Sequence, residues 1–430
     1  MARLALGIDI GTSGVRTAVL DGDGNLAAPM ARAPHGPDAG HDANAWWNTV
    51  SEALREQTRL LHSSGIAPQS IGHLAVDGTS GSMVLVDEAV RPVTTALMYN
   101  SSGFAEEARR IDTFAPQGSI ARGSSSALAR FLRLCVSDEA GKARHLLHQA
   151  DFVAARLAGH SLGSDDNNAL KTGWDPEVRQ WPDWFVAAGI PVDLLPEVHR
   201  VGDPIGVIDA DIATSFGLSP DVTLHAGTTD SSAAFVAAGA TAVGDAVTSL
   251  GTTLAIKLLS DRRIDDPARG IYSHRLGNMW LAGGASNTGG GVLAHYFSGD
   301  ELAELSERID PSQTSGLDYY PLLKPGERFP INDPALPPRL DPRPREDAVF
   351  LHGMLEGIAR IEAEGYRCLA ELGAPAPKRL LTAGGGARNP VWTAVRQRYI
   401  EAEFLSPRDT EAAIGAARLC LGGAWTGRSA

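Results

Sequence analysis

The N-terminal residues alternate between apolar and polar positions over two short segments, 3–9 and 15–21. This alternation predicts two β-strands, and the sequence DGDGN at the end of the second segment predicts a turn. The Gly-Thr-Ser-Gly sequence between the segments resembles a phosphate-binding loop. In dinucleotide-binding folds and P-loop proteins, however, that loop leads into a helix. The strand that follows here therefore indicates a hairpin and disfavours both of those folds.

The same pattern returns in the middle of the chain. Residues 246–259 form an apolar strand, a Gly-Thr-Thr tip and a returning strand, although no aspartate precedes this glycine. Just before them, residues 221–240 predict a strand, a glycine-containing loop and a helix that opens at Asp230. The repeated form predicts an internal duplication in an α/β protein, with two lobes that each present a hairpin tip to a shared cleft.

The segment between the hairpins has the apolar spacing of helices in some stretches and that of strands in others. It predicts, in order, a helix, two strands and two further helical stretches: 42–65, 71–78, 82–93, 124–137 and 143–159. His145 and His148 are expected on one exposed face of the last of these. Residues 159–176 are rich in Gly, Asp and Asn, which predicts a surface loop.

The C-terminal third ends in a second strand–glycine–helix pattern. A proline- and arginine-rich loop and a long helix, 324–347 and 347–373, precede a strand that ends in three glycines. Asn389 is a favourable N-cap for the next helix, and Pro390 suits its first turn. An alanine-rich helix over 410–423 closes the chain.

Composition narrows the class of protein. A chain of 430 residues with 43% hydrophobic and 21% charged residues is typical of a globular protein with two domains. The net charge of −13 disfavours polyanions, so nucleic-acid binding is not expected. Three widely spaced cysteines, no signal-peptide pattern and no long apolar stretch predict a cytoplasmic protein without a membrane partner. The histidines show no metal-binding spacing.

Phosphate chemistry is one interpretation of the first hairpin tip. Backbone N–H groups near glycine can contact phosphate oxygens, and Thr12 and Ser13 would add hydroxyl donors. Asp9, at the end of the preceding strand, could hold Mg²⁺ through water. The alternative is a plain hairpin turn, in which Asp and Gly are common for conformational reasons.

Asp230 and two further loops can likewise be interpreted either as catalytic or binding residues or as ordinary structural features. Asp230 could accept a hydroxyl proton during phosphoryl transfer, although helix dipoles also favour aspartate in a first turn. Gly251 and Thr252 form a second candidate phosphate loop. Gly384 and Gly385 could let an adenine ring lie against the backbone before the helix capped by Asn389. Each motif alone is weak, but their order along the chain indicates a phosphotransferase.

These residues resemble the FGGY carbohydrate kinases, which have the actin/hexokinase-type ATPase fold. Residues 9–16 match the family's motif D-x-G-T-[ST]-x-x-[KR] in full, and GTTDSSAAF resembles the segment with the catalytic aspartate, here Asp230. TSLGTT, GLDYYPLLKPGERFP, AGGGARNPVW and EAAIGAARL resemble later family blocks in the same order. The resemblance implies ATP and Mg²⁺ as cofactors. It also implies an N-terminal domain over 1–240, a nucleotide-side domain over 241–409, and a final helix, 410–430, that returns to the first domain.

Within the family, the sequence is most similar to the short D-ribulose kinases of bacteria and plants, which are xylulose kinase-like. The stretch DGTSGS and the segment DNNALK carry this resemblance, while LMYNSSG places Asn100 where the family usually has aspartate. By this resemblance Ser80 and Asp230 contact the sugar, and the reaction converts D-ribulose to D-ribulose 5-phosphate. Other ketoses and polyols, including D-xylulose and L-ribulose, remain alternatives. An actin-like ATPase and a non-catalytic sugar sensor are further alternatives, and the sequence predicts no oligomeric state.

Overall fold

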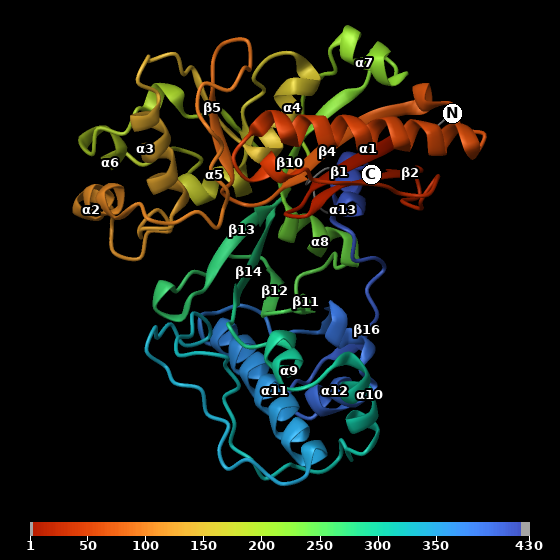
Figure 1. Ribbon diagram of the computed structural model, residues 1–430, viewed down its shortest axis with the longest axis vertical. Helices are drawn as coiled ribbons and strands as arrows, with labels where there is room; N and C mark the ends of the chain where they lie inside the picture. The colour runs from red at the N-terminus through yellow and green to blue at the C-terminus, as the bar shows by residue number, and fades with distance from the viewer. Residues whose placement is uncertain (1–2, 423–430) are drawn as a thin grey trace. The chain divides into compact units, whose positions relative to one another are not determined.

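Two six-stranded sheets organise the computed structural model, which describes residues 3–422 (Figure 1). The chain divides into two units, each built around one sheet. The first comprises Met1–Ala237, His274–Asn278 and Glu411–Ala430, and the second Ala238–Ser273 and Met279–Thr410. Among the described residues, no helix is long and apolar enough to cross a membrane.

The first sheet begins with the hairpin that the alternation predicts. Its strand order is β3-β2-β1-β4-β10-β9, in which β1 pairs antiparallel with β2 and parallel with β4. The strands are β1 Leu4–Ile10, β2 Gly14–Leu20, β3 Ala31–Pro34, β4 Ile71–Gly78, β9 Pro204–Val207 and β10 Thr223–Thr229. Since β10 is also parallel to β4, the carboxyl ends of β1, β4 and β10 lie at one edge of the sheet.

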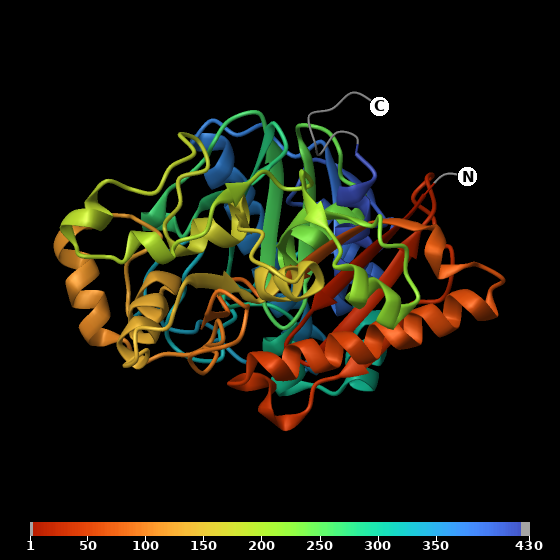
Figure 2. The ribbon, with the colours of Figure 1, turned by 90° about the horizontal axis from the view of Figure 1, so that it is seen from above.

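Alternate residues of the hairpin face two different helices. Leu6 and Ile8 belong to the core cluster that includes Trp46 of α1, Ala43–Ser63, and Figure 2 shows α1 along that face. Ala5 belongs instead to a cluster with Ala413 of α13, Ala412–Cys420. The period of two therefore assigns one face of the sheet to each helix.

Small residues allow α13 to approach the sheet closely. A methyl group at Gly7 would lie 1.9 Å from the Ala413 carbonyl oxygen, so only glycine fits at this position of β1. Gly415 makes the same kind of approach to α8, Asp230–Ala238, because a methyl group there would lie 1.8 Å from the Ala233 carbonyl oxygen. The alanine-rich composition of α13 thus reflects backbone-to-backbone packing.

The second sheet repeats the order of five strands of the first, and its sixth strand lies at the opposite end. Its order is β13-β14-β12-β11-β15-β16, and β11 pairs antiparallel with β12 and parallel with β15. The strands are β11 Asp245–Leu250, β12 Leu254–Ser260, β13 Tyr272–Leu276, β14 Met279–Ala285, β15 Arg379–Ala383 and β16 Glu403–Leu405. Its helices are α9 Gly290–Tyr296, α10 Gly299–Glu307, α11 Asp347–Glu371 and α12 Pro390–Gln397. The hairpin predicted over 246–259 is confirmed, and the matching order supports the predicted duplication.

The remaining elements belong to the first unit. They are β5 Met83–Val86, α2 Ala105–Phe114, α3 Ala127–Ser137, β6 His145–His148, α4 Gln149–Ala158, β7 Ser164–Asp165, α5 Asp166–Thr172, α6 Trp184–Ala187, β8 Val198–His199 and α7 Ala210–Phe216. The loop predicted before Asp230 is wrong, because β10 ends at Thr229 and α8 begins at the next residue.

The predicted exposed helical face at His145 and His148 is also wrong. Both residues lie in strand β6, which pairs antiparallel with β5, and the helix begins only at Gln149. His148 is fully buried, and its ring nitrogens hydrogen-bond Asp151 Oδ2 at 2.7 Å and Thr172 Oγ1 at 2.9 Å. Pairing with a strand distant in sequence overrides the local helical spacing.

The surface loop predicted over 159–176 is wrong as well, since it contains the buried elements β7 and α5. Asp165 caps α5 and accepts hydrogen bonds from the backbone N–H groups of Asn167 and Asn168. Burial, reinforced by the charge of Asp151, raises the pKa of Asp165 to about 7. Polar residues that satisfy one another can be buried, and composition alone does not show this.

Candidate active site

Three aspartates stand at the carboxyl edge of the first sheet. Asp9 is opposite Asp77 in the β1–β4 register, and Asp77 is opposite Thr228 in the β4–β10 register. Asp230 follows β10 directly and opens α8. Asp9 and Asp77 are buried, with 3% and 0% of their surface exposed, whereas Asp230 is half-buried. Parallel pairing therefore brings together acids that are separated by more than 200 residues.

Asp9 and Asp77 share one buried environment. Burial raises the pKa of Asp9, and contacts with Asp77 and Arg16 act in the opposite direction. Arg16 Nη1 lies 3.1 Å from Asp9 Oδ2, and Arg16 Nε lies 3.3 Å from Glu411 Oε2. Burial, then the charges of Asp9 and Asp230, raise the pKa of Asp77 well above its usual range. Asp9 and Arg16, the first and last residues of the motif, thus form an ion pair across the β1–β2 hairpin.

The donor set at this edge fits a magnesium ion. Among the described residues, no N–H or hydroxyl group donates to either carboxylate oxygen of Asp77, which faces Asp9. Two carboxylates in contact are favourable only with a proton or a cation between them. Within residues 3–422 no cluster of three metal-ligating side chains is formed. Mg²⁺ takes one or two carboxylates and keeps most of its waters, so Asp9 and Asp77 would be sufficient to hold it.

The sequence motifs predict Asp9 and Asp230 as site residues, but they do not include Asp77. The available signal was the tripeptide Val76-Asp77-Gly78 at the end of an apolar strand, which matches the position of Asp9 on β1. Recognising it requires the parallel β1–β4 register, which the sequence does not reveal. The tip residues Thr12 and Ser13 are exposed, and a hydrogen bond from the Gly11 N–H to the Gly14 carbonyl closes the hairpin at 3.0 Å.

Ser80 lies in the loop that follows β4. Its hydroxyl is buried and has no hydrogen-bond partner among the described residues. The loop is held by Arg130 of α3, which donates from Nε to the Gly81 carbonyl at 2.9 Å and from Nη1 to the Tyr99 carbonyl at 3.0 Å. Burial lowers the pKa of Arg130 to about 10. Arg130 therefore joins the Ser80 loop to the segment that contains Asn100.

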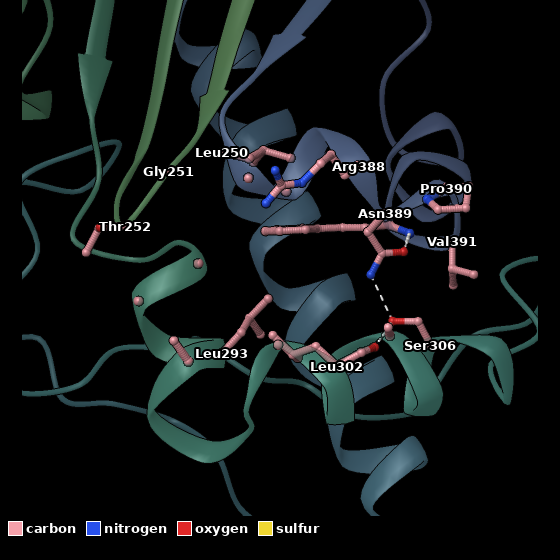
Figure 3. Close-up of a pocket in the computed structure, with 18 of the residues that line it drawn as sticks. Leu250, Gly251, Thr252, Leu293, Leu302, Ser306, Arg388, Asn389, Pro390 and Val391 are labelled. Atoms are coloured by element: carbon pink, nitrogen blue, oxygen red, sulfur yellow. Dashed lines mark hydrogen bonds between the residues drawn. The ribbon is translucent and has the colours of Figure 1, made fainter. Parts of the chain in front are cut away.

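The second unit contains a pocket of about 650 Å³, a size typical of small-molecule sites (Figure 3). The sequence-predicted residues Gly251, Thr252, Gly385 and Asn389 line it. Gly384 lies behind them at φ +87°, where a methyl group would be 2.6 Å from the Leu250 carbonyl oxygen. The hairpin tip and the glycine-rich segment, which are far apart in sequence, thus form one wall of the pocket.

The part of the lining that comes from α9 and α10 was not identified from the sequence. Gly290 and Gly291 begin α9, and Leu293, Leu302 and Ala303 supply apolar surface. Most of this lining is apolar and therefore suited to a flat ring. Nothing in the local sequence of α9 and α10 connects these helices with the pocket, because only the tertiary fold brings them to it.

The side chain of Asn389 makes two hydrogen bonds beside the pocket. Its Oδ1 accepts a hydrogen bond from the Trp392 N–H at 3.0 Å, which caps α12, and its Nδ2 donates to Ser306 Oγ at 2.8 Å (Figure 3). The predicted N-cap is confirmed. The same side chain also fixes α12 against α10, so Asn389 positions two helices that border the pocket.

The class of protein follows from the fold of both units together with these features. A xylulose kinase from Rhodospirillum rubrum has a TM-score of 0.83 and 21% identity, and the match covers 97% of this chain and 89% of that one. Glycerol kinase from Plasmodium falciparum, solved with ADP, has a TM-score of 0.82 and 15% identity over 97% of this chain and 89% of its own. The structure has the two-domain α/β fold of sugar kinases.

The family follows from the sequence matches. The model of the FGGY family of carbohydrate kinases, N-terminal domain, matches residues 4–237, and the model of the C-terminal domain matches 246–422. The chain belongs to the FGGY family of carbohydrate kinases, as the sequence motifs predicted. It is 24% identical to the xylulose kinase of Escherichia coli K12, over 96% of this chain and 89% of that protein. It is 26% identical to that of Streptomyces rubiginosus, over 97% and 88%.

Proposed function

We propose that this carbohydrate kinase transfers the γ-phosphoryl group of ATP to the 5-hydroxyl of D-ribulose. The observation that supports this most directly is the acidic edge of the first sheet, where a half-buried Asp230 stands beside the buried Asp9 and Asp77. A general base, a cation site and a sugar-facing loop at Ser80 follow one another on neighbouring strands. The resemblance of this loop to the D-ribulose kinases supports the choice of ketose.

Asp230 would act as the general base. A primary alcohol has a pKa far above that of a carboxylate, so proton transfer to Asp230 occurs late, as the bond to phosphorus forms. The O–H bond breaks towards Asp230, the alcohol oxygen bonds to the γ-phosphorus, and the bond to the β–γ bridging oxygen breaks to leave ADP. The transition state is loose, so positioning and charge stabilisation supply most of the rate.

The other predicted residues would hold the nucleotide and its cation. Asp9 would bind Mg²⁺, which neutralises charge on the phosphate oxygens when bound. Thr12 and Ser13 would donate to phosphate oxygens from the first hairpin, and Gly251 and Thr252 from the second. Gly384, Gly385 and Asn389 would border the adenosine. The pocket volume of about 650 Å³ and its apolar lining support this assignment.

D-Xylulose is the strongest alternative substrate, since several relatives are named xylulose kinases. A coupled assay of ADP release over D-ribulose, D-xylulose, L-ribulose and polyols separates the candidates. Preference for D-ribulose is expected, and equal turnover of D-xylulose and D-ribulose contradicts that choice. ATP hydrolysis without stimulation by any sugar would instead support an actin-like ATPase.

Substitution of Asp230 tests the mechanism. Asp230→Ala is expected to lower turnover at least tenfold, about 1.4 kcal/mol of barrier, with little change in ATP affinity. Asp21→Ala is a matched control, because Asp21 belongs to the turn after β2 and accepts hydrogen bonds only within that turn in the described residues. A smaller loss of turnover in Asp230→Ala would show that this residue is not the base.

A further inference from the structure

Gln149 is the first residue of α4, and only the oxygen of its side-chain amide has hydrogen-bond partners among the described residues. The residue is fully buried. Its Oε1 accepts hydrogen bonds from the Thr79 N–H at 2.9 Å and from Thr79 Oγ1 at 2.7 Å. Its Nε2, in contrast, has no hydrogen-bond partner among the described residues. A buried donor without an acceptor costs about 1–3 kcal/mol, so native structures rarely keep one without a reason.

The orientation of this amide is fixed by its neighbours. Oxygen and nitrogen of a glutamine amide are normally distinguished by hydrogen-bond partners alone. Here the Thr79 backbone N–H can only donate, so the atom that faces it must be the carbonyl oxygen. The remaining atom is therefore the NH₂ group, and a flipped side chain does not explain its missing partner.

Gln149 lies at the acidic edge of the first sheet. A methyl group at Gly78, the residue after Asp77, would lie 3.2 Å from Gln149 Oε1, so the amide contacts the end of β4. Gly78 is in turn opposite Thr229, the residue before Asp230. The amide thus lies beside the two strand ends that carry Asp77 and Asp230.

A further unsatisfied polar atom lies in the loop that follows β4. The Ser80 hydroxyl is buried and has no hydrogen-bond partner among the described residues. Together with Gln149 Nε2 it offers a hydroxyl, which can donate and accept, and an N–H donor within one short stretch of structure. A polyhydroxylated ligand presents both donors and acceptors and can satisfy such a set, whereas an apolar ligand would leave it unpaired.

We propose that Gln149 is a substrate-binding residue that donates a hydrogen bond from Nε2 to an oxygen atom of the acceptor sugar. The inference rests on the proposed function and adds a specificity-determining contact to it. Thr79 holds the amide carbonyl, so the N–H group is oriented before the sugar binds. The donor recognises an oxygen acceptor at one position of the substrate, and an analogue without that oxygen leaves the group unpaired.

Two variants of Gln149 and one control test this proposal. Gln149→Met removes both the donor and the acceptor with a similar side-chain length, and Gln149→Glu keeps an acceptor for Thr79 but removes the N–H group. Gln57→Met is the matched control. Gln57 is also a buried glutamine, but its Oε1 accepts from Thr17 and Ala31, and its Nε2 donates to the Pro29 carbonyl.

The expected result separates the acceptor sugar from ATP. Both Gln149 variants should raise the KM and the calorimetric Kd for D-ribulose roughly tenfold or more and leave the KM for ATP within about twofold. Gln57→Met should lower the melting temperature without changing either constant. A sugar Kd that stays within twofold in a folded Gln149 variant overturns the proposal.

A crystal structure of the wild-type protein with D-ribulose decides the question even where the variants fail to fold. A sugar oxygen within hydrogen-bond distance of Gln149 Nε2 supports the proposal, and a water molecule there with the sugar bound elsewhere overturns it. Loss of the proposed function is distinguishable from this outcome. If the wild type phosphorylates a polyol and no ketose, the choice of D-ribulose is wrong, and the same comparisons with that polyol still test Gln149.

Discussion

A fully buried ion pair joins strands and helices beside the pocket of the second unit, and breaking it should unfold this unit at a lower temperature. Arg396 of α12 donates from Nε to Glu362 Oε2 at 2.6 Å and from Nη2 to Glu362 Oε1 at 2.7 Å. Neither side chain is exposed. Thr248 of β11 donates to Glu362 Oε1, and Arg396 Nη1 donates to Thr382 Oγ1 of β15 at 2.8 Å. The network therefore ties together both strands that end at the pocket.

The substitution Arg396→Met leaves the Glu362 carboxylate buried without its counter-ion. Removing one partner of a buried pair costs about 3–5 kcal/mol, because the remaining charge is not solvated. For a unit of this size, each kcal/mol lowers the melting temperature by roughly 2–4 °C, so a decrease of about 6–20 °C is expected. The double variant Glu362→Leu/Arg396→Met should lose less unfolding free energy than the single variant Arg396→Met. It removes both charges and leaves only the Thr248 and Thr382 hydroxyls without those partners.

The assay is urea and thermal unfolding of wild type, both single variants and the double variant, with ATP affinity measured in parallel. The double-mutant cycle isolates the coupling between the two side chains. Arg367→Met is the surface control, because Arg367 pairs with Glu364 and Glu371 in solvent, where ion pairs contribute about 0–1 kcal/mol. A loss of unfolding free energy below about 1 kcal/mol for Arg396→Met, or additive losses in the double variant, would show that this pair does not stabilise the second unit.

Three further predictions concern the two sites and the packing between elements. In the presence of EDTA, the difference in unfolding free energy between Asp77→Asn and the wild type should shift in favour of the variant as the pH rises from about 4. The folded protein holds the Asp77 proton more tightly than the unfolded chain, so wild-type stability falls with rising pH, and a pH-independent difference in urea midpoints would contradict this. Asn389→Ala should lower the free energy of unfolding by about 1–2 kcal/mol, because α12 loses its cap, and it should weaken ATP binding. Asn389→Asp should keep the cap; urea unfolding measures the stability and nucleotide titration the affinity. Gly7→Val should destabilise the first unit by about 1–3 kcal/mol or prevent folding, because the new Cβ would clash with the Ala413 carbonyl oxygen. The control Gly36→Ala has open space around it and should leave the melting temperature nearly unchanged.

Local signals were sufficient for the hairpins and for the helix after the three glycines. The turns, the period-two alternation and the Asn389-Pro390 cap all act within a few residues, so the sequence predicts them without reference to the rest of the chain. The order of the motifs also indicated the family, because Asp9, Arg16 and Asp230 occur at the spacing its members use.

Burial and long-range pairing were the features that local signals misjudged. Residues 145–148 have helical spacing, but pairing with β5 makes them a strand. Residues 164–172 have the composition of a surface loop, but they are buried and bond to other segments: Asn167 Nδ2 donates to Thr228 Oγ1 at 2.9 Å, and Asp166 accepts from Arg179 at 2.8 Å. In both cases the deciding contacts come from distant segments, and the energy of burial exceeds the local preference of the backbone.

The family, the paired hairpins and the candidate base Asp230 can all be recognised in the amino-acid sequence. The contact of Asp77 with Asp9, and the unsatisfied N–H group of Gln149 at the ends of β4 and β10, appear only in the folded chain. The physical reason is that both relations depend on the register of parallel strands and on the docking of α4 onto β4, which are set by packing across the whole sheet. The local sequence at the end of a strand or the start of a helix does not show which distant segment will pack against it.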